Sequence, residues 1–391
     1  MNFRNTTLTL LSLFMTITLA YGCKENRKTN ADRLLANTEM TNIEKTEPVV
    51  QIALLLDTSN SMDGLINQAK SQLWDIVNEF SAAKCGNEVR PKLQIAIYQY
   101  GNDGLSSRQG YVQQVLNFSS DLDEISEKLF SLSTNGGEEY CGKVIQTSLE
   151  QLEWKKNKDQ LRMIFIAGNE PFDQGNYSYQ NASEHAKEKD IIVNTIYCGN
   201  YEQGINSYWK DGAVATGGEY MAIDQNKEIV YVKTPFDEII IKLNKRLNST
   251  YISYGSLGKS KLLSQELQDS NAMAYEQTVA VKRAVSKSSR LYNNKSWDLV
   301  DAASDSEFEL SEIATEELPA ELKGKSESEI KEFIEQKKLE RESVQKEIQE
   351  VNKKREAYIA KNRANPENGG LENVMLQAIK KQAESKNYSW D

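Results

Sequence analysis

The feature that most constrains this chain is a nearly continuous apolar run, VVQIALLL at 49–56, which ends abruptly in Asp57. A half-exposed strand alternates apolar and polar residues, so this run predicts a strand buried on both faces, as at the centre of a parallel sheet. Residues 62–83 follow with apolar side chains at helical spacing: Leu65, Ile66, Ala69, Leu73, Ile76, Val77 and Phe80. Their spacing predicts a helix that packs on the same sheet.

Short apolar runs continue to alternate with amphipathic helices as far as about residue 250. The further predicted strands are 92–101, 110–118, 161–168, 191–199 and 218–224, the first two joined by a hairpin-like link. The further predicted helices are 120–132, one through Trp154, and one around 182–189. This alternation predicts a doubly wound, mostly parallel α/β sheet, in which ligands bind beyond the carboxyl ends of the strands.

Composition changes after about residue 255. The segment 260–391 is rich in Lys, Glu, Gln and Ser and predicts three helices, at about 262–294, 326–363 and 369–386. Lys337 and Arg341 interrupt the apolar seam of the second helix, which argues against a long coiled coil. We therefore expect an α/β domain at 49–250, followed by a smaller all-α region at 260–391 that packs on itself or on that domain.

Residues 1–22 have the layout of a secretory signal peptide. Arg4 precedes an apolar run at 7–20, which is shorter than the ~20 residues that a membrane span needs. Cys23 follows a small residue and resembles the acylated cysteine of a bacterial lipobox; an ordinary signal peptide with an incidental cysteine is the alternative. Residues 23–48 are polar and predict a flexible tether. We expect an exported protein, lipid-anchored to the cell envelope at the outer membrane, on either its periplasmic or its surface side.

The charge balance argues against nucleic acid as a partner. The 391 residues include 57 acidic and 47 basic side chains, for a formal net charge of −10. A protein that binds phosphate backbones needs a dense basic face, which this composition disfavours.

Three oxygen-bearing side chains follow the first strand at alternate positions: Asp57, Ser59 and Ser61. A sharp turn at the end of a central strand is expected to direct them at one point above the sheet. One carboxylate and two hydroxyls form a hard oxygen cluster, which suits Mg²⁺ best and also Ca²⁺ or Mn²⁺. The start of the next helix adds backbone donors that favour an anionic ligand.

The stretch LLLDTSNSM resembles the DxSxS metal-ion-dependent adhesion site (MIDAS) of the von Willebrand factor type A family, and the resemblance covers about residues 49–250. GGEEYCG, FIAGNEPF and NTIYCG resemble a bacterial secreted subgroup of that family with no established activity. The resemblance implies a Rossmann-like fold and a non-enzymatic module that binds a partner protein through a divalent cation.

Two departures from the family pattern concern the remaining metal ligands. Glu138 stands where the family has a Thr, and Asn169 is the nearest equivalent of a family Asp. A ligating Glu138 would raise metal affinity and reduce dependence on an acidic ligand from the partner. The alternative is a vestigial site whose polar loops only hydrogen-bond to one another.

If Cys23 is lipidated, three cysteines remain, without metal-binding spacing. Cys141 and Cys198 follow loops at the expected metal-binding end, so a disulfide between them is one expectation; three free thiols are the alternative. Nothing places His185, the only histidine, near Cys141, which disfavours a catalytic dyad.

Three classes of function remain to be compared. A metal-dependent binding module is the leading one, and a scaffold formed by the C-terminal helices is the second. An enzyme is disfavoured because the chain has no GxSxG, HExxH or Walker motif. Aromatic residues near the expected site could form a contact rim or belong to the core; they are Tyr98, Tyr100, Tyr140, Tyr177, Tyr179, Tyr197, Tyr201, Tyr208 and Trp209.

Overall fold

The computed structural model describes residues 48–86, 89–157, 160–226, 231–362 and 371–390. These belong to a single compact unit, Glu47–Asp391. The expected signal peptide, and the tether with Cys23 up to residue 47, lie outside the described residues. Within the described ranges, no helix is long and apolar enough to cross a membrane.

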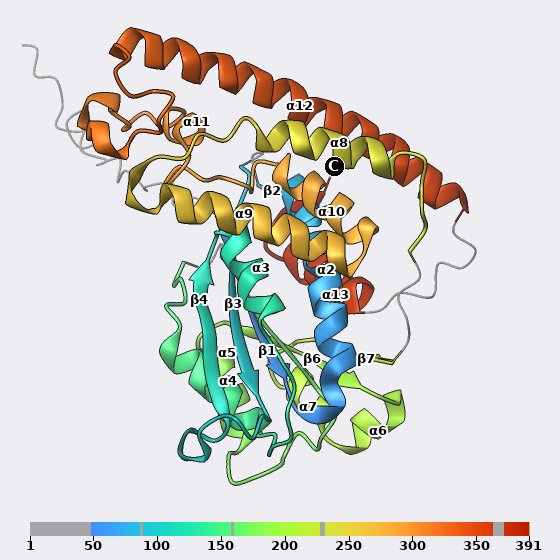
Figure 1. Cartoon of the computed structure of the whole chain (residues 1–391). Helices are drawn as coiled ribbons and strands as arrows, with labels where there is room; N and C mark the ends of the chain where they lie inside the picture. The colour runs from blue at the N-terminus through green and yellow to red at the C-terminus, as the bar shows by residue number, and fades with distance from the viewer. Residues whose placement is uncertain (1–47, 87–88, 158–159, 227–230, 363–370, 391) are drawn as a thin grey trace, which may run out of the picture. The chain divides into compact units, whose positions relative to one another are not determined.

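A six-stranded sheet forms the centre of the structure, in the order β4-β3-β1-β5-β6-β7 (Figure 1). The strands are β1 Val49–Asp57, β3 Lys92–Tyr100, β4 Val112–Ser119, β5 Leu161–Gly168, β6 Ile192–Cys198 and β7 Tyr220–Ile223. Only the pairing of β4 with β3 is antiparallel in this sheet; the other neighbours run parallel. The predicted mostly parallel sheet, including the hairpin at β3 and β4, is therefore confirmed.

Helices cover both faces of this sheet. Alternate residues of β1 enter two separate cores: Ile52 and Leu54 point to one face, and Ala53 and Leu55 to the other. The first face carries α2 Asp63–Ala82 and α3 Leu122–Phe130; the second carries α4 Cys141–Gln151, α5 Tyr179–Glu188 and α7 Trp209–Val214. The short α6 is Tyr201–Asn206, and 3-10 turns lie at Asn60–Met62, Ser107–Gln109, Leu310–Glu312 and Thr315–Glu317. Burial on both faces explains why the sequence of β1 lacks alternation.

The C-terminal region is helical, as predicted. Its helices are α8 Asp237–Asn248, α9 Gly255–Tyr275, α10 Gln277–Lys287, α11 Leu299–Ala302, α12 Glu327–Asn362 and α13 Leu371–Glu384. The long helix and the last one agree with the predicted 326–363 and 369–386. The expected single helix at 262–294 is wrong: Glu276 has extended backbone angles (φ −166°, ψ 139°), which separate α9 from α10. A last strand, β8 Tyr388–Trp390, pairs with β2 Ala83–Cys85.

Helices α8, α9, α11 and α12 lie at the end of the sheet opposite to the carboxyl end of β1 (Figure 1). The last helix, α13, returns to the sheet and packs beside α2. Its Met375 and Ile379 belong to the same core cluster as Ile52. Gln382 of α13 and Asn194 of β6 exchange two hydrogen bonds, of 2.6 and 3.1 Å. A segment far along the chain thus completes the cover of the sheet.

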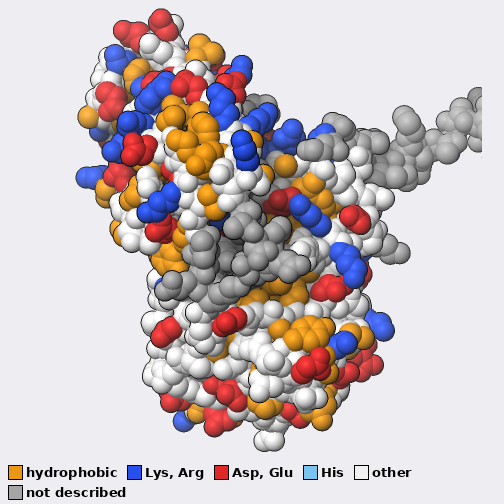
Figure 2. Space-filling view, turned by 90° about the vertical axis from the view of Figure 1, so that its right-hand side faces the viewer, with side chains coloured by type: hydrophobic (Ala, Val, Ile, Leu, Met, Phe, Trp, Pro, Cys, Tyr) orange, Lys and Arg blue, Asp and Glu red, His pale blue; other side chains and the backbone are white. Residues whose placement is uncertain are grey.

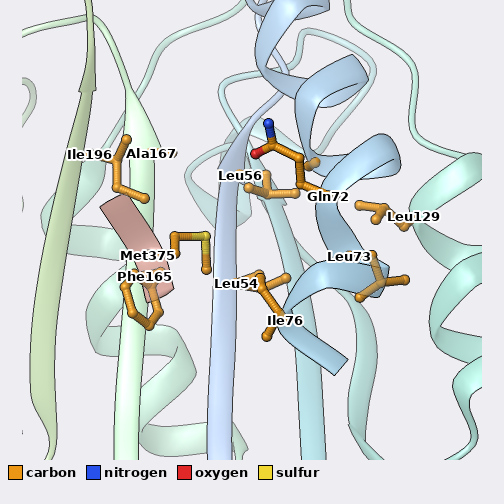
Figure 3. A pocket seen from close by; sticks show the side chains of 11 residues that line it. Leu54, Leu56, Gln72, Leu73, Ile76, Leu129, Phe165, Ala167, Ile196 and Met375 are labelled. Atoms are coloured by element: carbon orange, nitrogen blue, oxygen red, sulfur yellow. The ribbon is translucent and has the colours of Figure 1, made fainter. Parts of the chain in front are cut away.

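A small cavity remains where α13 meets the sheet. Figure 3 shows Met375 against the sheet, between Phe165 and Leu54, with α2 to one side. The cavity volume is about 20 Å³ and its lining is almost wholly apolar. That volume accommodates about one water molecule, so the cavity is a packing defect and not a ligand site.

Buried charges connect the helical region to the α/β core. Arg283 of α10 forms ion pairs with Asp123 of α3 (2.7 Å) and Asp269 of α9 (2.6 Å). Lys287 pairs with Asp269 at 2.9 Å, and the Tyr292 hydroxyl donates to Asp123 at 2.6 Å. Burial by itself would raise the pKa of Asp269, but Lys287 and Arg283 outweigh it and hold that pKa well below its ordinary value. Two acids thus balance two bases, as buried charges require.

Candidate metal centre

The candidate site begins at the carboxyl end of β1. Asp57 is the last residue of the strand and is fully buried, and the 3-10 turn Asn60–Met62 leads directly into α2. The Ser59 amide donates to Asp57 Oδ1 at 2.8 Å, an Asx-type turn that holds the carboxylate in place. The Ser59 and Ser61 hydroxyls lie 3.5 Å apart. The local DxSxS spacing therefore brings all three side chains to one point.

Asn169 comes from the neighbouring strand. It directly follows β5, which is parallel to β1 in the sheet, so both strand ends meet at the same edge. Its Nδ2 donates to the Ser61 hydroxyl at 3.1 Å, and its Oδ1 is buried without a hydrogen-bond partner. The structure thus joins Asn169 to Ser61 and leaves one amide oxygen available.

The loop before α4 approaches the site from the β3 side of β1, opposite to β5 and Asn169. The Asn135 amide donates to the Thr58 carbonyl at 2.9 Å. A Cβ at Gly137 would lie only 2.5 Å from the Gly101 carbonyl oxygen, so the two backbones are in close contact. This close approach requires glycine and sets the path of the loop.

The two glutamates of that loop have different environments. Glu138 is exposed, and no hydrogen bond joins its side chain to Asp57, Ser59 or Ser61 in the described structure, so its ligation stays a prediction. Glu139, which the sequence reasoning did not select, is 6% exposed and lies next to Asp57. Neighbouring residues of an extended loop point in opposite directions, and only the docked backbone decides which one faces inward.

The electrostatics of the site show unbalanced negative charge. Burial raises the pKa of Asp57 to about 7, against the opposing effect of the hydrogen bonds from Ser59. Burial and then the nearby Asp57 raise the pKa of Glu139 to about 8, with Glu170 adding to the effect. Two acids that lie together and are short of positive charge favour a cation between them.

The residues present fit a hard divalent cation. Asp57 Oδ2 is buried and has no hydrogen-bond partner, and Asn169 Oδ1 is in the same state. Together with the two serine hydroxyls they supply only oxygen donors, the type that Mg²⁺, Ca²⁺ and Mn²⁺ prefer. No group of three or more His, Cys, Asp or Glu in the described ranges could hold a metal, so such a site depends on the hydroxyls and the amide.

The expected disulfide between Cys141 and Cys198 is wrong: both cysteines are free. Cys141 belongs to the core on the α4 side of the sheet and Cys198 to the core on the α2 side, so the sheet separates them. Burial raises the pKa of both thiols well above the ordinary value. His185 contacts Gln146 at 3.1 Å and the Cys141 thiol contacts the Tyr100 hydroxyl at 3.8 Å, contacts that do not form a dyad.

Thiol titration of residues 47–391 without reductant tests this correction. We expect Cys141 and Cys198 to react with a thiol reagent only after unfolding, because both are buried protonated thiols. In denaturant all three thiols of this fragment should react. A count of one thiol in denaturant would show that a disulfide had formed.

The aromatic residues divide between core and surface. Tyr98, Tyr100, Tyr179, Tyr197 and Trp209 are buried. Tyr177, Tyr201 and Tyr208 are exposed, and the ring of half-buried Tyr140 lies 5.6 Å from that of Tyr177. Of the nine aromatic residues, only the exposed and half-buried ones are available to contact a partner.

Part of the chain matches a known protein family. The family model described as von Willebrand factor type A domain matches residues 51–216. No curated protein matches the chain. Among solved structures, proximal thread matrix protein 1 from the mussel byssus, with zinc occupied MIDAS motif, is similar at 13% identity and a TM-score of 0.34, over 45% of this chain and 42% of that one. This chain thus spans less than half of the byssus protein.

Two further solved structures are similar over a comparable length. BatB from Bacteroides thetaiotaomicron is 17% identical with a TM-score of 0.34, over 45% of this chain and 90% of that one. The SpRpn10 VWA domain is 13% identical with a TM-score of 0.34, over 46% of this chain and 90% of that one. From the family match and the α/β architecture we conclude that residues 51–216 of this chain form a von Willebrand factor type A domain.

Proposed function

We propose that this chain is a non-enzymatic binding protein of the cell envelope that engages a partner protein through a divalent cation held by its type A domain. Type A domains commonly mediate protein–protein interactions, often through a MIDAS. The observation that carries the proposal is Asp57 Oδ2, a buried carboxylate oxygen with no hydrogen-bond partner beside two hydroxyls. A buried oxygen of this kind is costly unless a cation or a donor satisfies it.

Each residue of the proposed site has a separate task. Asp57 provides the charged oxygen, and the Ser59 amide fixes its orientation through a 2.8 Å hydrogen bond. Ser59 and Ser61 add hydroxyl oxygens, and Asn169 positions Ser61 and adds its free amide oxygen. A bound cation, Mg²⁺ being the one we expect and Ca²⁺ or Mn²⁺ the alternatives, would offer an open position to an oxygen of the partner.

The surroundings of the site support binding to a protein. The exposed rings of Tyr177, Tyr201 and Tyr208 supply rigid contact area with polar tips. Figure 2 shows acidic side chains around the lower end of the face it draws, whereas Lys and Arg are intermixed with Asp and Glu over the upper part. This distribution and the net charge of −10 favour a protein partner over nucleic acid. Lipidation of Cys23 would anchor the protein at the outer membrane.

Calorimetric titration of residues 47–391 with Mg²⁺, Ca²⁺ and Mn²⁺, after chelator treatment, tests the proposal. We expect saturable binding at micromolar to low millimolar concentration, in the range of EF-hand and extracellular sites. Asp57→Ala should abolish it, because the one charged oxygen of the DxSxS motif is lost. Asp173→Ala is the matched control, an exposed acid in the loop after β5, and should bind as the wild type does. No heat, or equal heat in both variants, would contradict the site.

A further inference from the structure

Glu139 is a buried acid with no counter-charge in the described structure. Its side chain is 6% exposed, and no other described residue donates a hydrogen bond or an ion pair to its carboxylate. Its backbone is fixed, because the Glu139 amide donates to Gln174 Oε1 at 3.0 Å. Since burying an acidic group away from any basic side chain is costly, this position needs a separate explanation.

The side chain of Glu139 meets that of Asp57 above Gly101. A Cβ placed on Gly101 would lie 2.7 Å from Glu139 Cγ and 2.9 Å from Asp57 Oδ1. Gly101 has a positive φ of 74° and directly follows β3, so the absence of its side chain opens the space that the two acids share. Asp57 ends β1, whereas Glu139 lies in the loop between α3 and α4, so their meeting is a property of the assembled edge of the sheet.

Independent observations at the same edge point to a cation. Asp57 Oδ2 and Asn169 Oδ1 are buried and without hydrogen-bond partners. These orphaned oxygens belong to residues that end or follow adjacent strands, β1 and β5. A cation in this place would satisfy them together with the carboxylate of Glu139.

We propose that Glu139 supplies a second carboxylate to the cation held at Asp57. The inference rests on the proposed function and deepens it. Two carboxylates match the charge of a divalent cation, so the site binds its ion without an acidic group from the partner. The partner then completes the coordination with a neutral oxygen, such as an amide carbonyl or a hydroxyl.

The test compares Glu139→Gln with Glu138→Gln in Mn²⁺ and Ca²⁺ titrations of residues 47–391. The two glutamates are adjacent in the sequence and only Glu139 is buried, so the comparison decides which of them contributes to the cation site. We expect Glu139→Gln to weaken cation binding on the order of tenfold or more, because ligand charge sets affinity at oxygen sites. Glu138→Gln should leave it unchanged within about twofold, as an exposed charge contributes little.

Asp57→Asn distinguishes a failure of the role of Glu139 from a failure of the metal site itself. If Asp57→Asn abolishes binding and Glu139→Gln does not weaken it, the role of Glu139 is overturned and the metal site stands. If Asp57→Asn binds as the wild type does, the proposed function itself fails. Melting temperatures in chelator check folding: Glu139→Gln replaces the carboxyl group with a neutral amide of nearly the same shape and should melt no lower than the wild type.

Acetate tests the conclusion that the site binds its cation without an acidic group from the partner. Its carboxylate takes the place of an acidic partner group that could reach the cation. We expect millimolar acetate to raise the cation affinity of Glu139→Gln and to leave that of the wild type unchanged. An equal gain in both proteins would overturn the conclusion that the site needs no acidic partner.

Discussion

Replacing Arg283 with Met is expected to lower the free energy of unfolding by about 3–5 kcal/mol. This is the typical cost of removing one partner of a buried ion pair, because the other charge stays buried without compensation. Arg283 is 1% exposed, and its guanidinium contacts Asp123 and Asp269 while lying 4.9 Å from the centre of the Trp74 ring. Methionine would fill most of the volume, but it would leave Asp123 buried, with the Tyr292 hydroxyl as the one side-chain partner that remains among the described residues. Urea unfolding of the full chain measures the loss.

Arg246→Met is the matched control for this prediction. Arg246 also forms an ion pair, with Glu347 at 2.9 Å, but its side chain is 52% exposed. Exposed pairs contribute between nothing and about 1 kcal/mol, so this variant should unfold close to the wild type. Equal, small losses in both variants would show that the buried network adds no more than a surface pair.

A chain that stops after Tyr254 is expected to fail to fold, although it contains the whole type A domain. The cut removes α9 to α13, and side chains of α9, α10, α12 and α13 share one core cluster with the sheet; among them are Val279, Val281, Val285, Val344 and Ile379. At roughly 1.5–3 kcal/mol for each large buried side chain, these five alone contribute on the order of 10 kcal/mol. That loss is comparable to the 5–15 kcal/mol of stability of a typical domain.

Circular dichroism and gel filtration measure this outcome. The control is the chain 47–391, which contains every described element and should elute as a folded protein. A cooperative thermal transition in the shortened chain would contradict the prediction and show that the type A domain is stable alone. If the prediction holds, deleting the C-terminal helices cannot separate a binding role of the domain from a scaffold role of the helices. Point variants such as Asp57→Ala are then the appropriate tests.

Much of the α/β domain could be predicted from local pattern. The boundaries of β5 agree with the expected 161–168, and the helix expected at 62–83 is α2 at Asp63–Ala82. Runs buried on both faces and helices with one apolar face leave a strong signal in the sequence. The bounds of α12, Glu327–Asn362, also agree with the expected 326–363. The break at Glu276 carries no such signal, because neither Gly nor Pro marks it.

The sequence by itself determined the α/β architecture and the cluster of Asp57, Ser59 and Ser61, because the hydrophobic period and the DxSxS spacing act over a few neighbouring residues. The tertiary structure alone decided that Glu139 and not Glu138 faces Asp57, since the contact of Gly137 with Gly101 sets the loop. It also decided that Cys141 and Cys198 lie on opposite faces of the sheet. The C-terminal helices pack on the domain with the help of the ion pair between Asp123 and Arg283, which are 160 positions apart in the sequence. Such pairings follow from how whole elements dock, and no local pattern encodes them.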